Sequence, residues 1–308
     1  MEVTYILTTI EIIIAILAGI GNTFVITIFF KDEKLRNRKI NSLFVSQAFS
    51  DLLVGIIGIP LNILLYLKLA NEFCKLTISN IIAVRTVSIN NVLLISFDRY
   101  KALSHPIKYA AKQSKFSLKI SIFSSWFFGL LLGFIICFYN NDKHETECTF
   151  KNIITRDYAY FLQFVSSVLP FTTLVVIYSY VYLAMRKVHL NHTCDTCVDL
   201  QNSSKTICKI RRREFHATVN MLAIVASFAI CKFPLLILHL TYEIFYEVEK
   251  DKNLQQVFIA INHLTTIINP ILYALKLKDF RKSCIEFLSI ETENKTSLYN
   301  RSQQRNHI

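Results

Sequence analysis

The chain has 308 residues, of which 53% are hydrophobic and only 18% are charged. A soluble domain rarely combines so little charge with so many Ile, Leu and Phe residues, which excludes soluble folds whose outer helices need polar faces. The formal net charge is +12, but no basic soluble domain is present to hold a nucleic acid, so we expect no such partner.

Seven long apolar stretches dominate the chain, and each is long enough to cross a bilayer, which takes about 20 mostly apolar residues. The first stretch is too long for a signal peptide and is expected to act as a membrane anchor. The gaps are short, so residues 1–290 are expected to form one domain. We therefore predict an all-α membrane protein, a seven-transmembrane helix bundle with spans near residues 5–30, 41–66, 73–100, 118–139, 158–185, 214–245 and 254–275.

The segment after the seventh span has a different pattern. Residues 276–287 place Leu277, Phe280, Cys284 and Phe287 on one side, which predicts a short amphipathic helix on the inner leaflet. Cys284 is a candidate for palmitoylation, and an unmodified thiol is the alternative. The polar residues 291–308 are expected to form a disordered cytoplasmic tail.

Positive charges gather in the links after spans 1, 3 and 5, and the alternate links hold far fewer. The positive-inside rule therefore places these links and the C-terminus in the cytoplasm and the N-terminus outside. The basic links are expected to contact anionic membrane lipid. The third inside link also contains His189, His192, Cys194 and Cys197. A zinc site and reduced thiols in a flexible loop are its two interpretations, and we expect the thiols and no metal.

Two short motifs lie where spans end. Asp98-Arg99-Tyr100 closes the third span, and Asn269-Pro270-Ile271-Leu272-Tyr273 closes the seventh. Together with the seven spans, they resemble the signature of the rhodopsin-type (class A) G-protein-coupled receptors. The resemblance implies a multi-pass plasma-membrane receptor that binds an extracellular small molecule within the bundle and activates heterotrimeric G proteins. It also implies that the chain is not an enzyme.

The resemblance assigns Arg99 the output role at the cytoplasmic end. Asp98 is expected to hold Arg99 from the same helix, and Glu214 is expected to clamp it from span 6. Breaking this clamp would open a cavity for the G protein, as in other bistable elements. Tyr178 and Tyr273 match the tyrosines that hold the arginine in the active state. The alternative is a simple interfacial salt bridge.

Four polar residues within the spans match a second group of signature positions, and intramembrane polar groups are commonly functional. They resemble the pocket that holds a sodium ion and waters in inactive receptors, and they are Asn22, Asp51, Ser88 and Asn269. A purely structural hydrogen-bond network is the alternative. Cys74 opens span 3 and Cys148 lies in an outside loop, so both face the oxidising side. Their spacing matches the family's disulfide.

The ligand class is addressed by positions where receptor subfamilies differ. The aspartate of amine receptors is replaced by Ile81, and the lysine of opsins is replaced by His263. Adenosine receptors carry a histidine at that second position, paired with a glutamate that corresponds to Glu11. The similarity to adenosine receptors continues at three contacts expected to line the site, Phe150, Leu235 and Ile259, and it implies an adenosine or nucleoside-like ligand.

Other positions depart from the adenosine receptors. His239 replaces an asparagine, Lys232 replaces a tryptophan, and Arg85 replaces a threonine. Arg85 and Lys232 are expected to face each other, and two cations in a low dielectric repel. One interpretation is a small organic anion as the ligand. The other is a neutral Lys232 beside an Arg85 that is satisfied by water and backbone.

Two further classes of function share the predicted fold. A non-signalling scaffold or decoy is favoured by Lys232, but the intact Asp98-Arg99-Tyr100 motif and Glu214 argue against it. A transporter or channel would need paired ionisable groups along a path through the membrane, and the sequence lacks them.

Overall fold

The computed structural model describes residues 2–69, 73–105, 107–109, 115–138, 148, 153, 155–192, 202–244 and 252–289. Within these ranges the chain is helical and forms no β-strand. Seven helical segments of the described chain are long and apolar enough to cross a membrane, namely Val3–Lys31, Asn41–Tyr66, Cys74–Ser104, Phe116–Phe138, Asp157–Ala184, Phe215–Thr241 and Asn253–Lys276. The predicted all-α bundle of seven spans is therefore confirmed.

Several spans are built from more than one helical element. Spans 1 to 4 comprise α1 (Glu2–Lys31), then α3 (Asn41–Leu53) with η1 (Val54–Gly58) and α4 (Ile59–Tyr66), then α5 (Cys74–Ser104), then α7 (Lys115–Phe134) with η2 (Ile135–Phe138). Spans 5 to 7 comprise α9 (Arg156–Gln163) with η3 (Phe164–Val168) and α10 (Leu169–His192), then α11 (Asn202–Ile244), then α12 (Lys252–His263) with α13 (Thr265–Lys276). A short α2 (Glu33–Asn37) follows span 1, and residues 278–289 form a last helix.

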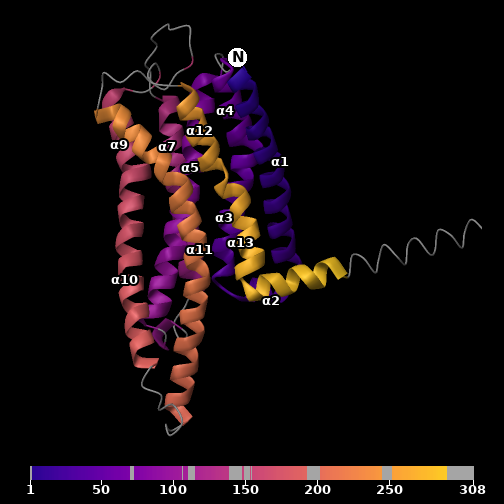
Figure 1. Cartoon of the computed structure of the whole chain (residues 1–308), viewed down its shortest axis with the longest axis vertical. Coiled ribbons are helices and arrows are strands. Elements are labelled where there is room, and N and C mark those ends of the chain that lie inside the picture. Colours follow the sequence, from indigo (N-terminus) through magenta and orange to yellow (C-terminus); the bar gives the residue numbers. More distant parts are fainter. Residues whose placement is uncertain are drawn as a thin grey trace, which may run out of the picture.

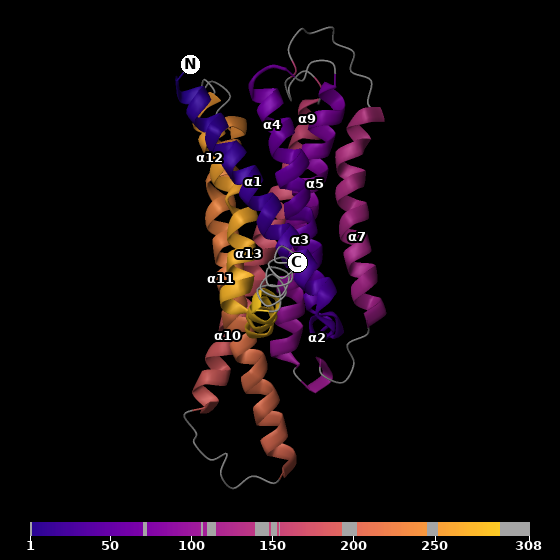
Figure 2. The same ribbon diagram turned by 90° about the vertical axis from the view of Figure 1, so that its right-hand side faces the viewer.

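The spans run side by side along the long axis of the molecule (Figure 1). At the end away from the N-terminus, α10 and α11 extend beyond the other spans, as both views show (Figure 2). The helix of residues 278–289 leaves the bundle at this same end and lies across its axis (Figure 1). We call this the Arg99 end, because Arg99 lies near the end of α5.

Two spans contain a wide π-helical turn just before a proline. η1 ends at Gly58 and Pro60 follows two residues later, and η3 ends at Val168 with Pro170 in the same relative position. Proline has no N–H to donate, and its ring clashes with a carbonyl of the preceding turn. A wider turn relieves this conflict without breaking the span. Pro234, in contrast, lies inside a continuous α11.

Span 3 is the centre of the bundle, since α5 packs against α3, α7, α10 and α11. Its close approach to α7 depends on two glycines. A Cβ added at Gly129 would lie 2.4 Å from a methyl group of Val87, and one at Gly133 would lie 2.5 Å from the Ser79 carbonyl oxygen. Larger residues would force the two helices apart, and this separation would disrupt the polar contacts that α5 makes.

The largest buried cluster lies toward the Arg99 end. It joins spans 1, 2, 3, 6 and 7 to the last helix, whose Phe280 and Cys284 are buried in it. The ring of Phe287 packs edge-on against Phe24 at 6.1 Å. An ion pair between Arg38 and Asp279 ties the same helix to the first link. The predicted amphipathic helix is thus present over residues 278–289.

Candidate functional site

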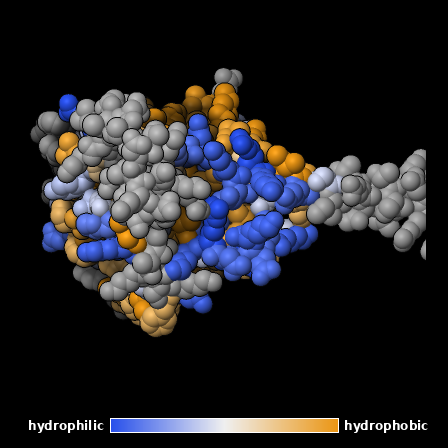
Figure 3. All heavy atoms as spheres, turned by 90° about the horizontal axis from the view of Figure 1, so that it is seen from below, coloured by the Kyte–Doolittle hydropathy of each residue, from blue (hydrophilic) through white to orange (hydrophobic). Residues whose placement is uncertain are grey.

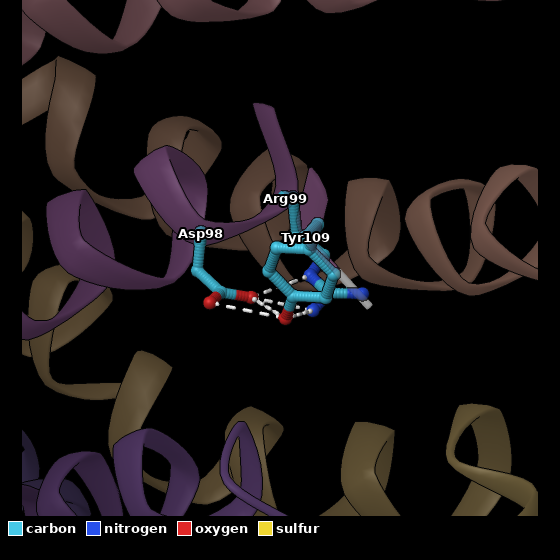
Figure 4. A network of polar contacts seen from close by, with 3 residues as sticks. All are labelled: Asp98, Arg99 and Tyr109. Carbon is cyan, nitrogen blue, oxygen red and sulfur yellow. Dashed lines mark hydrogen bonds and ion pairs between the residues drawn. The ribbon is translucent and has the colours of Figure 1, made fainter. Parts of the chain in front are cut away.

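Arg99 is buried at the end of α5, with only 3% of its surface exposed. Its Nη2 donates to Asp98 Oδ2 at 2.5 Å and to the hydroxyl of Tyr109 at 2.8 Å. The Tyr109 hydroxyl in turn donates to Asp98 Oδ2 at 2.9 Å. Figure 4 shows the three side chains converging, with the tyrosine oxygen at the meeting point of carboxylate and guanidinium. Asp98 from the same span and Tyr109 from the following link therefore both hold the charge of the arginine.

Tyr109 is a residue that the sequence motifs did not indicate. It belongs to residues 107–109, and its backbone N–H donates to the His105 carbonyl at 2.8 Å. This local turn carries the ring back toward Arg99, whose guanidinium carbon lies 5.7 Å from the ring centre. The only sequence signal is a tyrosine ten residues after an arginine, which is too common a pattern to be diagnostic.

The other predicted switch residues lie around this network. Tyr178 accepts a hydrogen bond from Ser96 at 3.4 Å and packs among Leu103, Ile177 and Val181. Tyr100 packs against the same cluster as Tyr178. Tyr273 packs elsewhere in the bundle and is fully buried, with its ring centre 5.2 Å from that of Phe44. The side chain of Glu214 lies outside the described residues, so the expected clamp from span 6 stays a prediction.

A second polar cluster surrounds Asp51 in the middle of the bundle. Asp51 Oδ2 accepts from Asn269 Nδ2 at 2.7 Å, and its Oδ1 accepts from Ser88 at 3.4 Å. Gln47, one helical turn before Asp51, donates to the same Oδ1 at 2.9 Å. The Asn22 amide donates to the Thr266 carbonyl at 2.9 Å and so joins spans 1 and 7. Three of the four predicted residues meet directly, and Gln47 is an addition.

The chemistry of this cluster suits a small cation. The side-chain oxygens of Asn22, Gln47 and Asn269 are buried and accept no hydrogen bond. Together with the Asp51 carboxylate, they supply the oxygen ligands that a hard cation prefers. Water could also satisfy these atoms, because each is an acceptor in a polar site.

Glu11 and His263 form a buried pair between spans 1 and 7. The Oε2 atom of Glu11 lies 2.8 Å from Nδ1 of His263, and the glutamate is fully buried while the histidine side chain is 12% exposed. Two ionisable groups buried together each reduce the other's desolvation. The chain interrupts its helix at Leu264, directly after the histidine, so the pair lies beside a break in span 7.

The remaining residues of the expected ligand site are only partly brought together. Leu235 is fully buried and packs with Leu238, Phe258 and Ile259 between spans 6 and 7. His239 follows one turn later in α11. Phe150, which was expected to cover the site, lies outside the described residues.

Arg85 and Lys232 line one pocket between spans 3, 5 and 6, as expected. The cavity itself is small, about 20 Å³, which is room for about one water molecule, and Phe171 and Phe228 are among its other walls. The Arg85 Nε atom is buried without a hydrogen-bond partner. The Lys232 ammonium lies 5.1 Å from the ring centre of Phe228. Among the described residues of the lining there is no acid, so two cationic side chains share a largely apolar space.

Residues 21–273 match the family model described as 7 transmembrane receptor (rhodopsin family). The chain belongs to this family. It is also similar to the adenosine receptor A2b of Gallus gallus, at 28% identity over 94% of this chain and 89% of that receptor. The adenosine receptor A3 of Ovis aries is 25% identical over 93% and 90% of the two chains. The histamine H2 receptor of Homo sapiens is 28% identical over 96% and 85%.

Family membership fixes the general activity. This rhodopsin-family receptor is a small-molecule-binding, G-protein-coupled membrane protein, and its family consists of receptors rather than enzymes. The relatives include both adenosine and histamine receptors at similar identity. Sequence identity alone therefore does not indicate the ligand, which has to be inferred from the side chains of the pocket.

Two cysteine predictions can be compared with the receptor's structure. The Cys74–Cys148 disulfide is formed, with the two Cα atoms 5.6 Å apart. Cys284 is only 8% exposed and is packed inside the largest buried cluster. Burial raises the pKa of its thiol to about 11. Both burial and the raised pKa lower the reactivity of this thiol, and palmitoylation of Cys284 stays a prediction.

Proposed function

We propose that this receptor lies in the plasma membrane with its N-terminus outside, and that its ligand is a small organic anion bound at Arg85 and Lys232. The pocket shared by these two side chains carries the proposal. The positive-inside distribution of the links supports the orientation. The output is activation of a heterotrimeric G protein at the Arg99 end.

The electrostatics of the pocket support an anion over a neutral ligand. Two cations in a low-dielectric space repel each other, and a carboxylate or phosphate between them would turn this repulsion into two attractive contacts. The Arg85 Nε atom, which lacks a protein acceptor, could donate to such a group. The rings beside it, Phe171 and Phe228, would have to move apart to admit the organic body of the same ligand, and they would then give it an apolar surface.

The ligand must favour one state of the receptor over another if it is to signal. The pocket lies between spans 3, 5 and 6, and Lys232 is two residues before Pro234, the proline inside α11. Drawing Lys232 toward an anion would therefore bias the position of span 6 at its proline. Movement of span 6 opens the Arg99 end to the G protein. Arg99 then leaves Asp98 and Tyr109 and contacts the G protein instead.

We also propose that the Asp51 cluster holds a sodium ion in the inactive state. The residues that would hold it are Asp51 and the partnerless amide oxygens of Asn22, Gln47 and Asn269. The ion would balance a carboxylate buried in the membrane. Ser88 and Gln47 orient the same carboxylate by donating to its Oδ1.

A nucleoside-like ligand is the second candidate. The contact between Glu11 and His263 at 2.8 Å favours it, because this pair is the feature that the sequence shares with adenosine receptors. In that case the ligand would lie nearer spans 6 and 7, beside Leu235 and Ile259. Arg85 and Lys232 would then have no direct role in binding.

One experiment separates the two candidates. G-protein activation would be measured in cells with a panel of small carboxylates and phosphates beside adenosine, using wild type, Arg85→Gln, Lys232→Gln and His263→Ala. An anionic agonist should lose about tenfold to one-hundredfold in potency in each of the first two variants, since each removes a charge-assisted hydrogen bond. Lys68→Gln is the control, because it removes an exposed charge elsewhere.

The opposite pattern would favour the second candidate. A response to adenosine that survives Arg85→Gln and Lys232→Gln but fails in His263→Ala would contradict the anion proposal. Silence toward both classes, from receptors detected at the cell surface, would contradict both.

A further inference from the structure

A groove opens at the Arg99 end, on the side where α5 and α7 meet residues 107–109. Its volume is about 360 Å³. It is separate from the pocket of Arg85 and Lys232, with which it shares no lining residue. Its walls divide into a basic part near the link and an apolar part along the two spans.

The basic part consists of Lys101, His105 and Lys108, whose side chains are all exposed. Among the described residues of the lining, Asp98 is the only acid, and it already accepts from Arg99 and Tyr109. The groove therefore has an excess of positive charge. From this end of the molecule, hydrophilic side chains occupy much of the described surface and hydrophobic ones lie toward its edges (Figure 3).

The apolar part consists of Leu94, Phe97 and Leu118. Leu94 and Leu118 pack against the largest buried cluster, whereas the Phe97 side chain is 43% exposed. Phe97 lies one helical turn before Lys101 in Cys74–Ser104, a segment long and apolar enough to cross a membrane, so we expect its exposed face to meet acyl chains. An apolar wall inside the bilayer is thus continuous with a basic rim at its boundary.

We propose that this groove binds one anionic phospholipid of the cytoplasmic leaflet. Its phosphate lies between Lys101 and Lys108, and an acyl chain lies along Phe97 and Leu118. The ligand chemistry is an anionic headgroup joined to an apolar chain, because either part alone would leave half of the groove unmatched. The cytoplasmic leaflet supplies such lipids and concentrates them beside basic residues.

The bound lipid also acts on the switch. Asp98 and Tyr109 line the groove, and the same two side chains hold Arg99 at 2.5 and 2.8 Å. A lipid that packs against Tyr109 stabilises the arrangement in which Arg99 is withheld from the G protein. By linkage, the lipid lowers activation and an activated receptor binds the lipid less tightly. Both effects rest on the proposed orientation in the membrane, and this second one rests on the proposed G-protein output as well.

Binding is tested with the full-length receptor in phosphatidylcholine nanodiscs that contain a photoreactive phosphatidylserine. Crosslinks are expected at the groove and mapped by mass spectrometry. The variant Lys101→Gln/Lys108→Gln should reduce crosslinking about tenfold or more, because two cations at an anionic surface are lost. The matched control, Lys276→Gln/Lys278→Gln, removes two exposed charges from the same end and should leave groove crosslinks unchanged.

A second variant fills the groove without changing its charge. Ser117 is an exposed lining residue, so Ser117→Trp should fold and should also reduce the crosslinks. Equal loss in the control pair would show general attraction to the surface and overturn the proposal. Full competition by inorganic phosphate or by oleate would also overturn it, since each represents only part of a phospholipid.

The effect on signalling is read separately, as nucleotide exchange by the G protein in nanodiscs with and without phosphatidylserine. The lipid should lower exchange by the wild type and have no effect on Lys101→Gln/Lys108→Gln. Unchanged exchange despite intact crosslinking would overturn the regulatory role alone. Absence of exchange under every condition would instead contradict the proposed function, and the crosslinks would still decide the lipid site.

Discussion

Two pairs of ionisable side chains are buried in this receptor in opposite ways. Glu11 and His263 lie 2.8 Å apart and can carry opposite charges. Arg85 and Lys232 line one pocket and carry the same sign, with no acid among the described residues of that lining. A charge in a low dielectric needs a partner. The first pair contains its own partner, whereas no acid lines the pocket of the second pair, which is a property expected of an anion site.

The largest expected effect follows from breaking the first pair. His263→Ala would leave the fully buried Glu11 without its partner and should reduce the free energy of unfolding by about 3 kcal/mol. Thermal unfolding of the purified receptor measures this loss, with the exposed His216→Ala as control. Equal stability of the two variants would mean that the contact between Glu11 and His263 does not stabilise the receptor.

The second pair should respond in the opposite direction. Lys232→Met keeps the length of the side chain but removes one of two like charges. The free energy of unfolding of the ligand-free receptor should therefore rise by about 1.5 kcal/mol. The same thermal measurement applies, with Lys278→Met at an exposed site as control. A loss of stability would show that Lys232 already has a compensating partner within the bundle. It would contradict the contrast drawn between the two pairs.

The Asp98–Arg99 pair at the Arg99 end tests whether two opposite charges in contact can also act as a switch. Tyr109→Phe removes the hydroxyl that contacts both charges and should weaken the withheld state by about 1 kcal/mol, or about fivefold in basal nucleotide exchange. Exchange without agonist is the measurement, at matched receptor amounts. Tyr182→Phe, which alters an exposed tyrosine of α10, is the control and should have no effect.

Cys284 shows a third way to bury an ionisable group, which is to keep it neutral, and here the smallest effect on stability or signalling is expected. Its pKa of about 11 lies above the ordinary value of 9.0, so burial favours the protonated thiol. This contribution to stability is complete below pH 9 and is lost as the pH rises through 11. Alkylation of Cys284 in the folded receptor should be slow at neutral pH and accelerate toward pH 11. Rapid alkylation at pH 7 would place the sulfur outside the buried cluster.

The general organisation of the receptor followed from the sequence. The seven spans appear where apolar length predicted them, within a few residues at each end, because crossing a bilayer requires a property that is local in the chain. The disulfide between Cys74 and Cys148 was also predicted from the family's spacing. The Asp98-Arg99-Tyr100 motif, at the end of the third of seven spans, indicated the family from the sequence.

The partners of the charged side chains needed the tertiary structure. Gln47 joins Asp51, and Tyr109 joins Arg99, although neither residue stands out in the sequence. The break at Leu264 and the wide turns before Pro60 and Pro170 were not predicted either. Each depends on how helices rotate and shift against one another.

The sequence by itself therefore determined the class of protein, the number of its spans and the position of its output motif, since hydropathy and short motifs are read along one chain. The tertiary structure decided how closely the charged side chains meet. The resemblance to adenosine receptors had already paired Glu11 with His263 and set Arg85 against Lys232, but it contained no distance for either pair. Only their placement across helices gives one pair a partner and leaves the other facing a pocket, because electrostatic energy in a membrane depends on distances that the sequence does not contain.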